Sequence, residues 1–204
     1  MKSPSRWCSL GSLGWMRGGY LARRPPAPRF SPGAVRALQA GDVGHAEAIR
    51  WDSLNWLEAE PFPEKYAVSD GDVLMPLRAN PPRAIVARGV PDRVVVVGHW
   101  ALITPDPTRV DPGFLVWYLN HPATRARLQG LMRGTNLQFL SLVTLRDFEV
   151  ELPPLALQRR IARVHALAEH MTELERQLAA ARKQLIHSVT HAALQRAVQR
   201  QADK

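Results

Sequence analysis

The C-terminal quarter of the chain carries the clearest pattern of apolar and polar positions. Its apolar residues alternate mostly at spacings of three and four, as along the seam of a coiled coil. They are Ile161, Val164, Leu167, Met171, Leu174, Leu178, Ala181 and Leu185. Neither glycine nor proline interrupts residues 155–204, and some 40 helical residues would extend roughly 60 Å. Because such a helix cannot bury its apolar stripe alone, we predict that it packs on another helix.

Before this helix, the apolar pattern predicts a mixed domain of short strands and helices. Apolar and alternating runs predict strands at residues 35–38, 73–75, 84–87, 93–98 and 99–103. Helices are predicted from Pro112 and over 123–132. Two consecutive prolines, Pro153-Pro154, remove two backbone donors and end the domain. The predicted fold class is therefore α+β, with a mixed globular domain over 1–153 and one long coiled-coil-type helix over 154–204.

The formal net charge of +9 is unevenly distributed. Residues 1–41 contain seven Lys or Arg and no acidic residue, residues 42–153 eleven against fourteen, and residues 154–204 nine against four, which gives +7, −3 and +5. The basic character therefore lies on an N-terminal arm, residues 1–41, and on the helix. Attraction to phosphates explains such charge, and so does the arginine-rich composition of a GC-rich genome.

Cysteine content and hydropathy indicate a cytoplasmic protein. The single Cys8 excludes a disulfide framework and a multi-thiolate zinc site within one chain. The N-terminus offers no apolar run of signal-peptide length, and no transmembrane span is predicted.

The junction between domain and helix resembles a known family. The string LPPLALQRRIARVHALAEHMTELERQ is similar to the end of a target recognition domain and the start of the spacer helix in DNA specificity subunits of type I restriction-modification systems. The chain keeps Pro153, Pro154, Gln158 and Ile161 of that pattern. It has Leu157 where the family usually has a glutamate, which removes a favourable charge from the helix N-terminus.

Two further stretches resemble the same family. Gly71-Asp72 followed by three apolar residues is similar to the turn that leads into a central strand of these subunits, although the loop after it lacks the usual glycine. Trp7, Leu10-Gly11 and Gly18-Gly19 resemble the family's opening. Residues 5–41 are either an arm held by its aromatic side chains or a base-contacting segment. Further on, Trp51, Trp56 and Leu57 are predicted to fill the core rather than to bind a ligand.

The resemblance implies a DNA-reading subunit, and loop residues are the candidates for contact. Arginine and asparagine can pair with guanine and adenine edges in the major groove. The candidate DNA-binding residues are Arg23, Arg24, Arg78, Asn80, Arg83, Arg133, Thr135 and Asn136, with Arg23 and Arg24 assigned to phosphates.

No catalytic residues, cofactor or metal ligands are predicted. Asn80-Pro81-Pro82 is similar to an adenine methyltransferase motif, but Arg83 replaces its aromatic residue and no glycine-rich cofactor loop precedes it. His187 and His191 lie four apart on the predicted helix, but no glutamate follows the first, so we interpret them as solvated. The chain is therefore expected to read DNA rather than to act as an enzyme.

The expected partners are double-stranded DNA, methyltransferase subunits and a second copy of the chain. Full-length specificity subunits resemble two such units in tandem, and this chain has one. We therefore predict a homodimer that pairs through Leu167, Met171, Leu174, Leu178, Ala181 and Leu185 and reads a bipartite target. Two alternatives remain: an orphan half-subunit that modulates such a complex, and a coiled-coil adaptor whose mixed domain binds protein.

Overall fold

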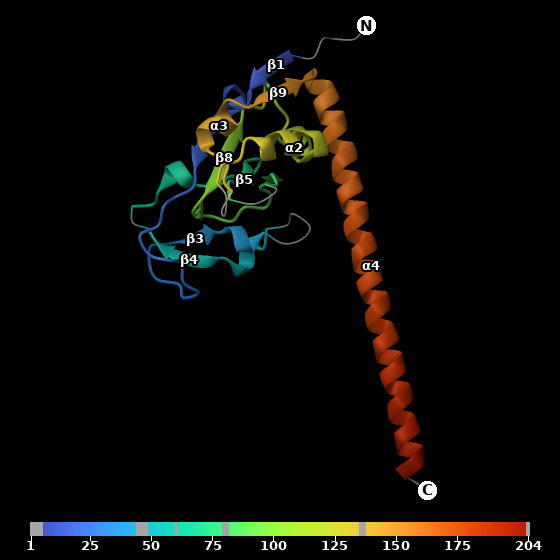
Figure 1. Cartoon of the computed structure of the whole chain (residues 1–204). Helices are drawn as coiled ribbons and strands as arrows, with labels where there is room; N and C mark the ends of the chain where they lie inside the picture. The colour runs from blue at the N-terminus through green and yellow to red at the C-terminus, as the bar shows by residue number, and fades with distance from the viewer. Residues whose placement is uncertain (1–5, 44–48, 60, 79–81, 135–137, 203–204) are drawn as a thin grey trace. The chain divides into compact units, whose positions relative to one another are not determined.

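The computed structural model describes residues 6–43, 49–59, 61–78, 82–134 and 138–202 (Figure 1). The chain divides into two units, Met1–His165 and Ala166–Lys204. The first unit contains the helices α1 (Pro112–Asn120), α2 (Pro122–Gly130) and α3 (Leu142–Arg146) and the first turns of α4 (Leu155–Ala202). The second unit is the remainder of α4 with the chain end.

The described strands of the first unit form three sheets. β1 (Arg6–Ser9) and β9 (Glu149–Leu152) form an antiparallel pair. An antiparallel sheet has the order β2 (Gly14–Gly18), β8 (Trp100–Pro105), β5 (Val73–Pro76) and β6 (Ile85–Val86). A third sheet has the order β4 (Asn55–Glu58), β3 (Ala34–Leu38) and β7 (Val94–Val96), with β3 and β7 parallel. Short 3-10 helices occur at Leu10–Leu13, Ala40–Asp42, Trp51–Ser53 and Glu64–Tyr66.

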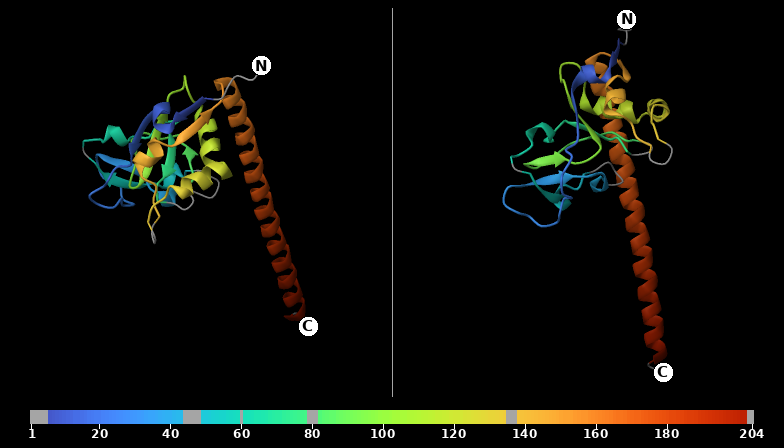
Figure 2. Two further views of the ribbon diagram at one scale, coloured as in Figure 1. Left: turned by 45° about the horizontal axis from the view of Figure 1, so that its top comes forward. Right: turned by 60° about the vertical axis from the view of Figure 1, so that its left-hand side comes forward.

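The four-stranded sheet is the middle layer of the first unit. Along β5, Val73 and Met75 belong to one apolar cluster with α1, whereas Leu74 belongs to another with Leu38 and Val96 of the three-stranded sheet. Helices α1 and α2 both contribute buried side chains to the first cluster, and Figure 2 shows the ribbon of the first unit from two further sides. Because β5 and β8 are covered on both faces, their sequences are continuously apolar rather than alternating.

The N-terminal segment differs from the predicted arm. Residues 6–18 form β1, a 3-10 turn and β2, and Leu10 and Leu13 are completely buried. Gly14 lies so close to β8 that a Cβ atom there would come within 2.1 Å of the Thr104 carbonyl oxygen. Gly14, one of the residues that break the apolar pattern of this segment, therefore permits close pairing of β2 with β8.

The predicted strands and helices occur with small shifts at their ends. The helix expected from Pro112 is α1, and Asp111 caps it by accepting the Phe114 N–H at 3.0 Å. Strands β1, β2, β4 and β9 and helix α3 were not predicted. Leu57 is buried as expected. Trp51 is partly buried and packs against the cluster that contains Leu38 and Leu74. Trp56 is also only partly buried, so the expectation that it fills the core is wrong for this residue.

The start of α4 belongs to the first unit. Ile161 and Ala162 pack against the apolar cluster that contains α1, and the contact boundary lies at His165 rather than at Pro153. The division of the chain into a recognition domain over 1–153 and a pairing helix over 154–204 stays a prediction. Within the described part of the chain, no helix has both the length and the apolar content to cross a bilayer.

Candidate nucleic-acid interface

The Gly71-Asp72 pair forms a buried polar anchor. Gly71 has φ +88°, a left-handed conformation that favours glycine. The Asp72 carboxylate accepts the Ser69 backbone N–H at 2.9 Å and the Thr104 hydroxyl at 2.6 Å, and lies 3.7 Å from the Arg17 guanidinium. Burial lowers the pKa of Arg17, and the charge of Asp72 opposes that shift. The Gly71-Asp72 motif, which carries part of the family resemblance, therefore has a structural role: it forms a turn and a buried ion pair.

Gln158 joins the first turn of α4 to two other segments. Its Oε1 accepts the Asp111 N–H at 2.9 Å, and its Nε2 donates to the carbonyls of Arg109 at 3.2 Å and Pro153 at 2.9 Å. The side chain is 1% exposed. The glutamine that the chain shares with the family's junction is therefore a buried clip that holds α4 to the N-terminus of α1.

Two loops that carry predicted DNA contacts are joined where one begins and the other ends. The Leu140 N–H donates to the Leu77 carbonyl at 2.9 Å, which joins the loop after β5 to the hairpin before α3. The Asn120 side chain holds the far end of the first loop by exchanging two hydrogen bonds of 2.8 Å with the backbone of Ala84. The hairpin is closed where Arg133 and Phe139 exchange two backbone hydrogen bonds of 2.9 Å.

Three predicted contact residues lie on these two loops. Arg78 and Arg83 belong to the first loop and Arg133 to the hairpin, and all three are exposed. Asn80, Thr135 and Asn136 lie outside the described residues. Arg78, Arg83 and Arg133 therefore lie on two loops whose ends are joined by a hydrogen bond, and their role in DNA binding stays a prediction.

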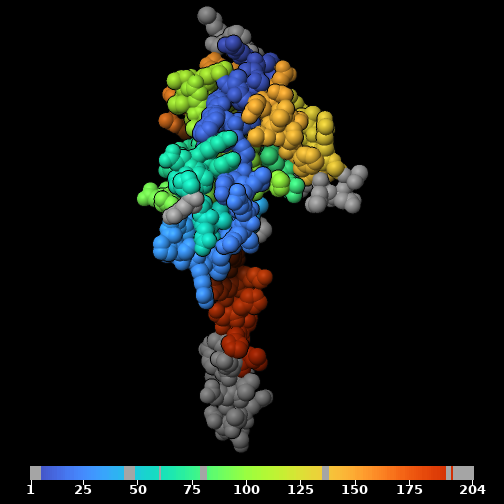
Figure 3. Space-filling view, turned by 90° about the vertical axis from the view of Figure 1, so that its left-hand side faces the viewer, coloured from blue at the N-terminus to red at the C-terminus, as the bar shows by residue number. Residues whose placement is uncertain are grey.

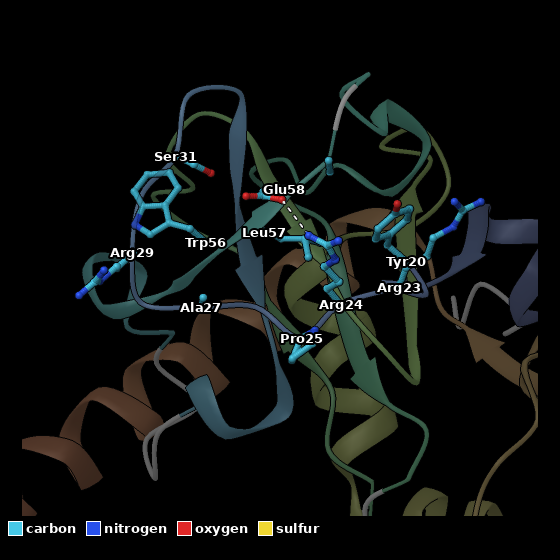
Figure 4. Close-up of a pocket in the computed structure, with 11 residues that line it drawn as sticks. Tyr20, Arg23, Arg24, Pro25, Ala27, Arg29, Ser31, Trp56, Leu57 and Glu58 are labelled. Atoms are coloured by element: carbon cyan, nitrogen blue, oxygen red, sulfur yellow. Dashed lines mark ion pairs between the residues drawn. The ribbon is translucent and has the colours of Figure 1, made fainter.

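The other two predicted contacts lie in a separate groove. Segment 20–31 and strand β4 enclose about 650 Å³. Figure 4 shows the side chains that line this groove, among them Tyr20, Arg23, Arg24, Arg29, Trp56 and Glu58. Arg24 reaches toward Glu58, with 3.8 Å between guanidinium and carboxylate. Both side chains are more than two-thirds exposed, so water screens this pair and it holds Arg24 weakly.

Sequence reasoning missed an aromatic pair beside this groove, which Trp56 lines and Phe30 contacts. The Phe30 and Trp56 rings meet edge to face with centroids 4.9 Å apart, and the Arg36 guanidinium lies 5.0 Å from the Trp56 centroid. Phe30 is 65% exposed. Trp56 is thus a platform between an aromatic ring and a cation, contrary to the expectation that it only fills the core. The aromatic residues between the arginines of the N-terminal segment were the available signal.

The predicted pairing surface lies on α4. Its large apolar side chains are at least half exposed; they are Leu167, Met171, Leu174, Leu178 and Leu185. Ala181 is exposed as well. On the same helix, Arg176 donates to Glu173 at 2.7 and 2.8 Å, and this hydrogen bonding lowers the pKa of Glu173 to about 2. His187 and His191 are both exposed.

Comparison with known proteins identifies the fold. No protein-family model matches the chain, and no curated protein matches it in sequence. Among solved structures, the chain is similar to the HsdS subunit from Thermoanaerobacter tengcongensis, with 22% identity and a TM-score of 0.62 over 90% of this chain and 46% of that one. It is also similar to the S subunit of a type I restriction-modification system from M. genitalium, with 15% identity and a TM-score of 0.54 over 85% of this chain and 41% of that one.

A third similar chain comes from a structure concerned with complex assembly and conformational transition of a type I R-M system. Its identity is 22% and its TM-score 0.51, over 86% of this chain and 43% of that one. The chain thus spans less than half the length of each of these structures. The predicted α+β fold, a mixed domain followed by a long helix, is confirmed as the fold of type I specificity subunits.

Proposed function

We propose that this chain is a DNA sequence-recognition subunit of a type I-like restriction-modification system. The observation that carries the proposal is the fold match, which extends over at least 85% of this chain but less than half of each specificity subunit. One recognition domain with one spacer helix accounts for that proportion. The chain would contribute no catalytic residue and would direct methyltransferase and endonuclease subunits to a bipartite target.

DNA would be read by the two loops whose ends are joined by the Leu140–Leu77 hydrogen bond. Arg78, Arg83 and Arg133 are exposed there, and their guanidinium groups can donate two hydrogen bonds to a guanine edge. The ends of both loops are fixed by backbone hydrogen bonds and by the hydrogen bonds of Asn120. Because their ends are fixed, the loops lose less conformational entropy on binding.

The second half of the recognition function would come from a second copy. The apolar stripe of α4 is exposed from Leu167 to Leu185, and solvent exposure of five large apolar side chains in one row is unfavourable. Pairing with the same stripe of another copy buries this surface and gives a two-fold symmetric reader. Two readers related in this way recognise the two halves of an interrupted symmetric site.

A selection experiment tests the proposal. The full chain, alone and together with the methyltransferase subunit of a type I system, is incubated with a pool of random-sequence duplex DNA, and retained or methylated duplexes are sequenced. We expect enrichment of one split motif with two symmetric halves. Association with the methyltransferase subunit without sequence preference would instead favour the orphan half-subunit. Absence of DNA retention, with behaviour insensitive to salt, would favour the protein-binding adaptor.

A further inference from the structure

The groove between segment 20–31 and β4 is bordered by a loop that is rigid for reasons of sequence. Residues 25–32 contain four prolines, Pro25, Pro26, Pro28 and Pro32, each of which fixes its own φ. Between them, Ala27 exchanges two backbone hydrogen bonds of 2.7 and 2.8 Å with Trp56 of β4. The loop therefore has few conformations to lose when it meets a ligand.

This loop presents a phenylalanine to solvent from a braced position. The Phe30 ring is 65% exposed and rests edge to face on Trp56. Arg36 lies over the Trp56 ring and donates to the Trp51 carbonyl at 3.1 Å. The space-filling view shows the N-terminal segment at the surface of the first unit (Figure 3). Phe30 thus contributes little to the core, and Trp56, which it contacts, is held by its backbone hydrogen bonds with Ala27 and by the Arg36 guanidinium.

The charge around Phe30 indicates what kind of partner fits. Arg23, Arg24 and Arg29 line the groove, and Glu58 is the acidic side chain among its lining residues. Figure 4 shows Arg29 extending away from Glu58, on the Trp56 side of the groove. No acidic residue occurs in the sequence from 1 to 41. An exposed ring that follows Arg29 in the sequence and contacts Trp56 at the edge of an arginine-lined groove is complementary to a polyanion that also offers apolar surface, as the grooves of duplex DNA do.

We propose that loop 25–32 binds duplex DNA by inserting Phe30 at a base step from the minor groove, with Arg29 and Arg24 on the flanking phosphates. The inference rests on the proposed function and adds a second mode of reading to it. Phenylalanine cannot hydrogen-bond to base edges, so it reads how easily a step opens. Flexible pyrimidine–purine steps, above all TA, are the favoured sites of insertion.

Four variants of the full chain separate these contributions. Phe30→Ala removes the ring, Phe30→Leu replaces it by a smaller apolar side chain, and Arg29→Ala removes one phosphate contact. Leu21→Ala is the matched control, because Leu21 is an apolar residue of the same segment that is 72% exposed. The probes are duplexes enriched from the random pool, in versions with TA or GG at the step facing the loop. A 2-aminopurine placed at that step reports unstacking through its fluorescence.

Wild type and Leu21→Ala are expected to bind alike and to raise the fluorescence. Phe30→Ala is expected to bind about tenfold more weakly, without the fluorescence rise and without preference for TA, at an unchanged salt slope. Phe30→Leu, which keeps an apolar wedge, should retain part of the preference. Arg29→Ala should reduce the salt slope by about one contact and keep the TA preference.

If wild type enriches a motif but Phe30→Ala gives the same binding and the same fluorescence as wild type, the insertion of Phe30 is refuted and the proposed function is not. A wild-type chain that enriches no motif and retains no duplex would overturn the proposed function and the insertion together. Circular dichroism of each variant verifies the fold, which loss of an exposed ring should leave intact.

Discussion

Replacing Gln158 by alanine tests whether the junction glutamine holds the first turn of α4 to the recognition domain. The substitution leaves the Asp111 N–H and the carbonyls of Arg109 and Pro153 without the partner that they have now. The site is 1% exposed, so water reaches these groups poorly. A buried polar group without a partner costs about 1–3 kcal/mol, and partial relaxation around the smaller side chain reduces the sum. We therefore expect a loss of about 2–4 kcal/mol.

The assay is thermal unfolding of the full chain, followed by tryptophan fluorescence because the tryptophans lie in the first unit. For a domain of this size, about 2–4 kcal/mol lowers Tm by roughly 5–15 °C. Gln184→Ala is the matched control: it makes the same change on the same helix, at an exposed position, and should leave Tm within about 1 °C. Equal Tm values for Gln158→Ala and Gln184→Ala would refute the clip. Gln158→Glu adds a diagnostic, because a carboxylate there would face two carbonyl oxygens and should destabilise more at neutral pH than at pH 4.

Three further predictions concern pairing, the buried anchor and the loops. Leu174→Glu should weaken self-association on the order of 100-fold, because both copies of a two-fold symmetric dimer lose the buried leucine. Ala180→Glu, outside the stripe, should not weaken it. Light scattering measures both variants, and a monomeric wild type would contradict the pairing. Arg17→Met should cost about 3–5 kcal/mol by leaving Asp72 buried without its cation; urea unfolding measures it, and a loss below about 1 kcal/mol would contradict the anchor. Arg83→Ala should cost about 1–3 kcal/mol of binding and relax specificity at one base position, whereas Arg24→Ala should weaken all sequences alike; identical selection profiles for the two would contradict this division.

The structure also changes how the helix should be removed. A truncation after Pro154 would delete Gln158 with the stripe, and Ile161 and Ala162 with their core contacts. Loss of pairing could then reflect damage to the first unit. A truncation after His165 keeps these contacts and removes Leu167 to Leu185, so a dimer that becomes a monomer on this truncation would assign pairing to the stripe.

The sequence predicted elements whose pattern depends on their own residues. The continuously apolar β5, β7 and β8, the Pro112 helix start and the three-and-four spacing of α4 are patterns of this kind. It did not predict β1 and β9, because their pairing joins segments more than 140 residues apart: Arg6 lies opposite Leu152. Nor did it predict β2, because Gly14 suggested an irregular segment, whereas its missing side chain allows β2 to lie close to β8.

The candidate site was predicted less completely for a related reason. Arg23 and Arg24 were identified by charge, but the groove that contains them exists because Ala27 pairs with Trp56, and no local pattern announces that pairing. Phe30 was not singled out, because the sequence left open whether residues 5–41 are held by their aromatic side chains or contact bases; its ring is 65% exposed. Contacts between distant segments therefore decide which exposed side chains gather at one place.

The residues that carry the family resemblance and the residues proposed to read DNA are separate sets. Gly71 supplies a left-handed turn, Asp72 closes a buried ion pair and Gln158 clips a helix to its neighbour. Each is fixed by contacts inside the chain, so a substitution costs stability whatever the target sequence. Arg78, Arg83 and Arg133 are exposed on loops whose bases are held by backbone groups and by Asn120. Substitution at these positions leaves the anchors intact, so the same scaffold can support a different specificity. The anchors therefore belong to the fold, which the chain shares with specificity subunits at 15–22% identity, whereas the proposed recognition of target bases would depend on residues outside them.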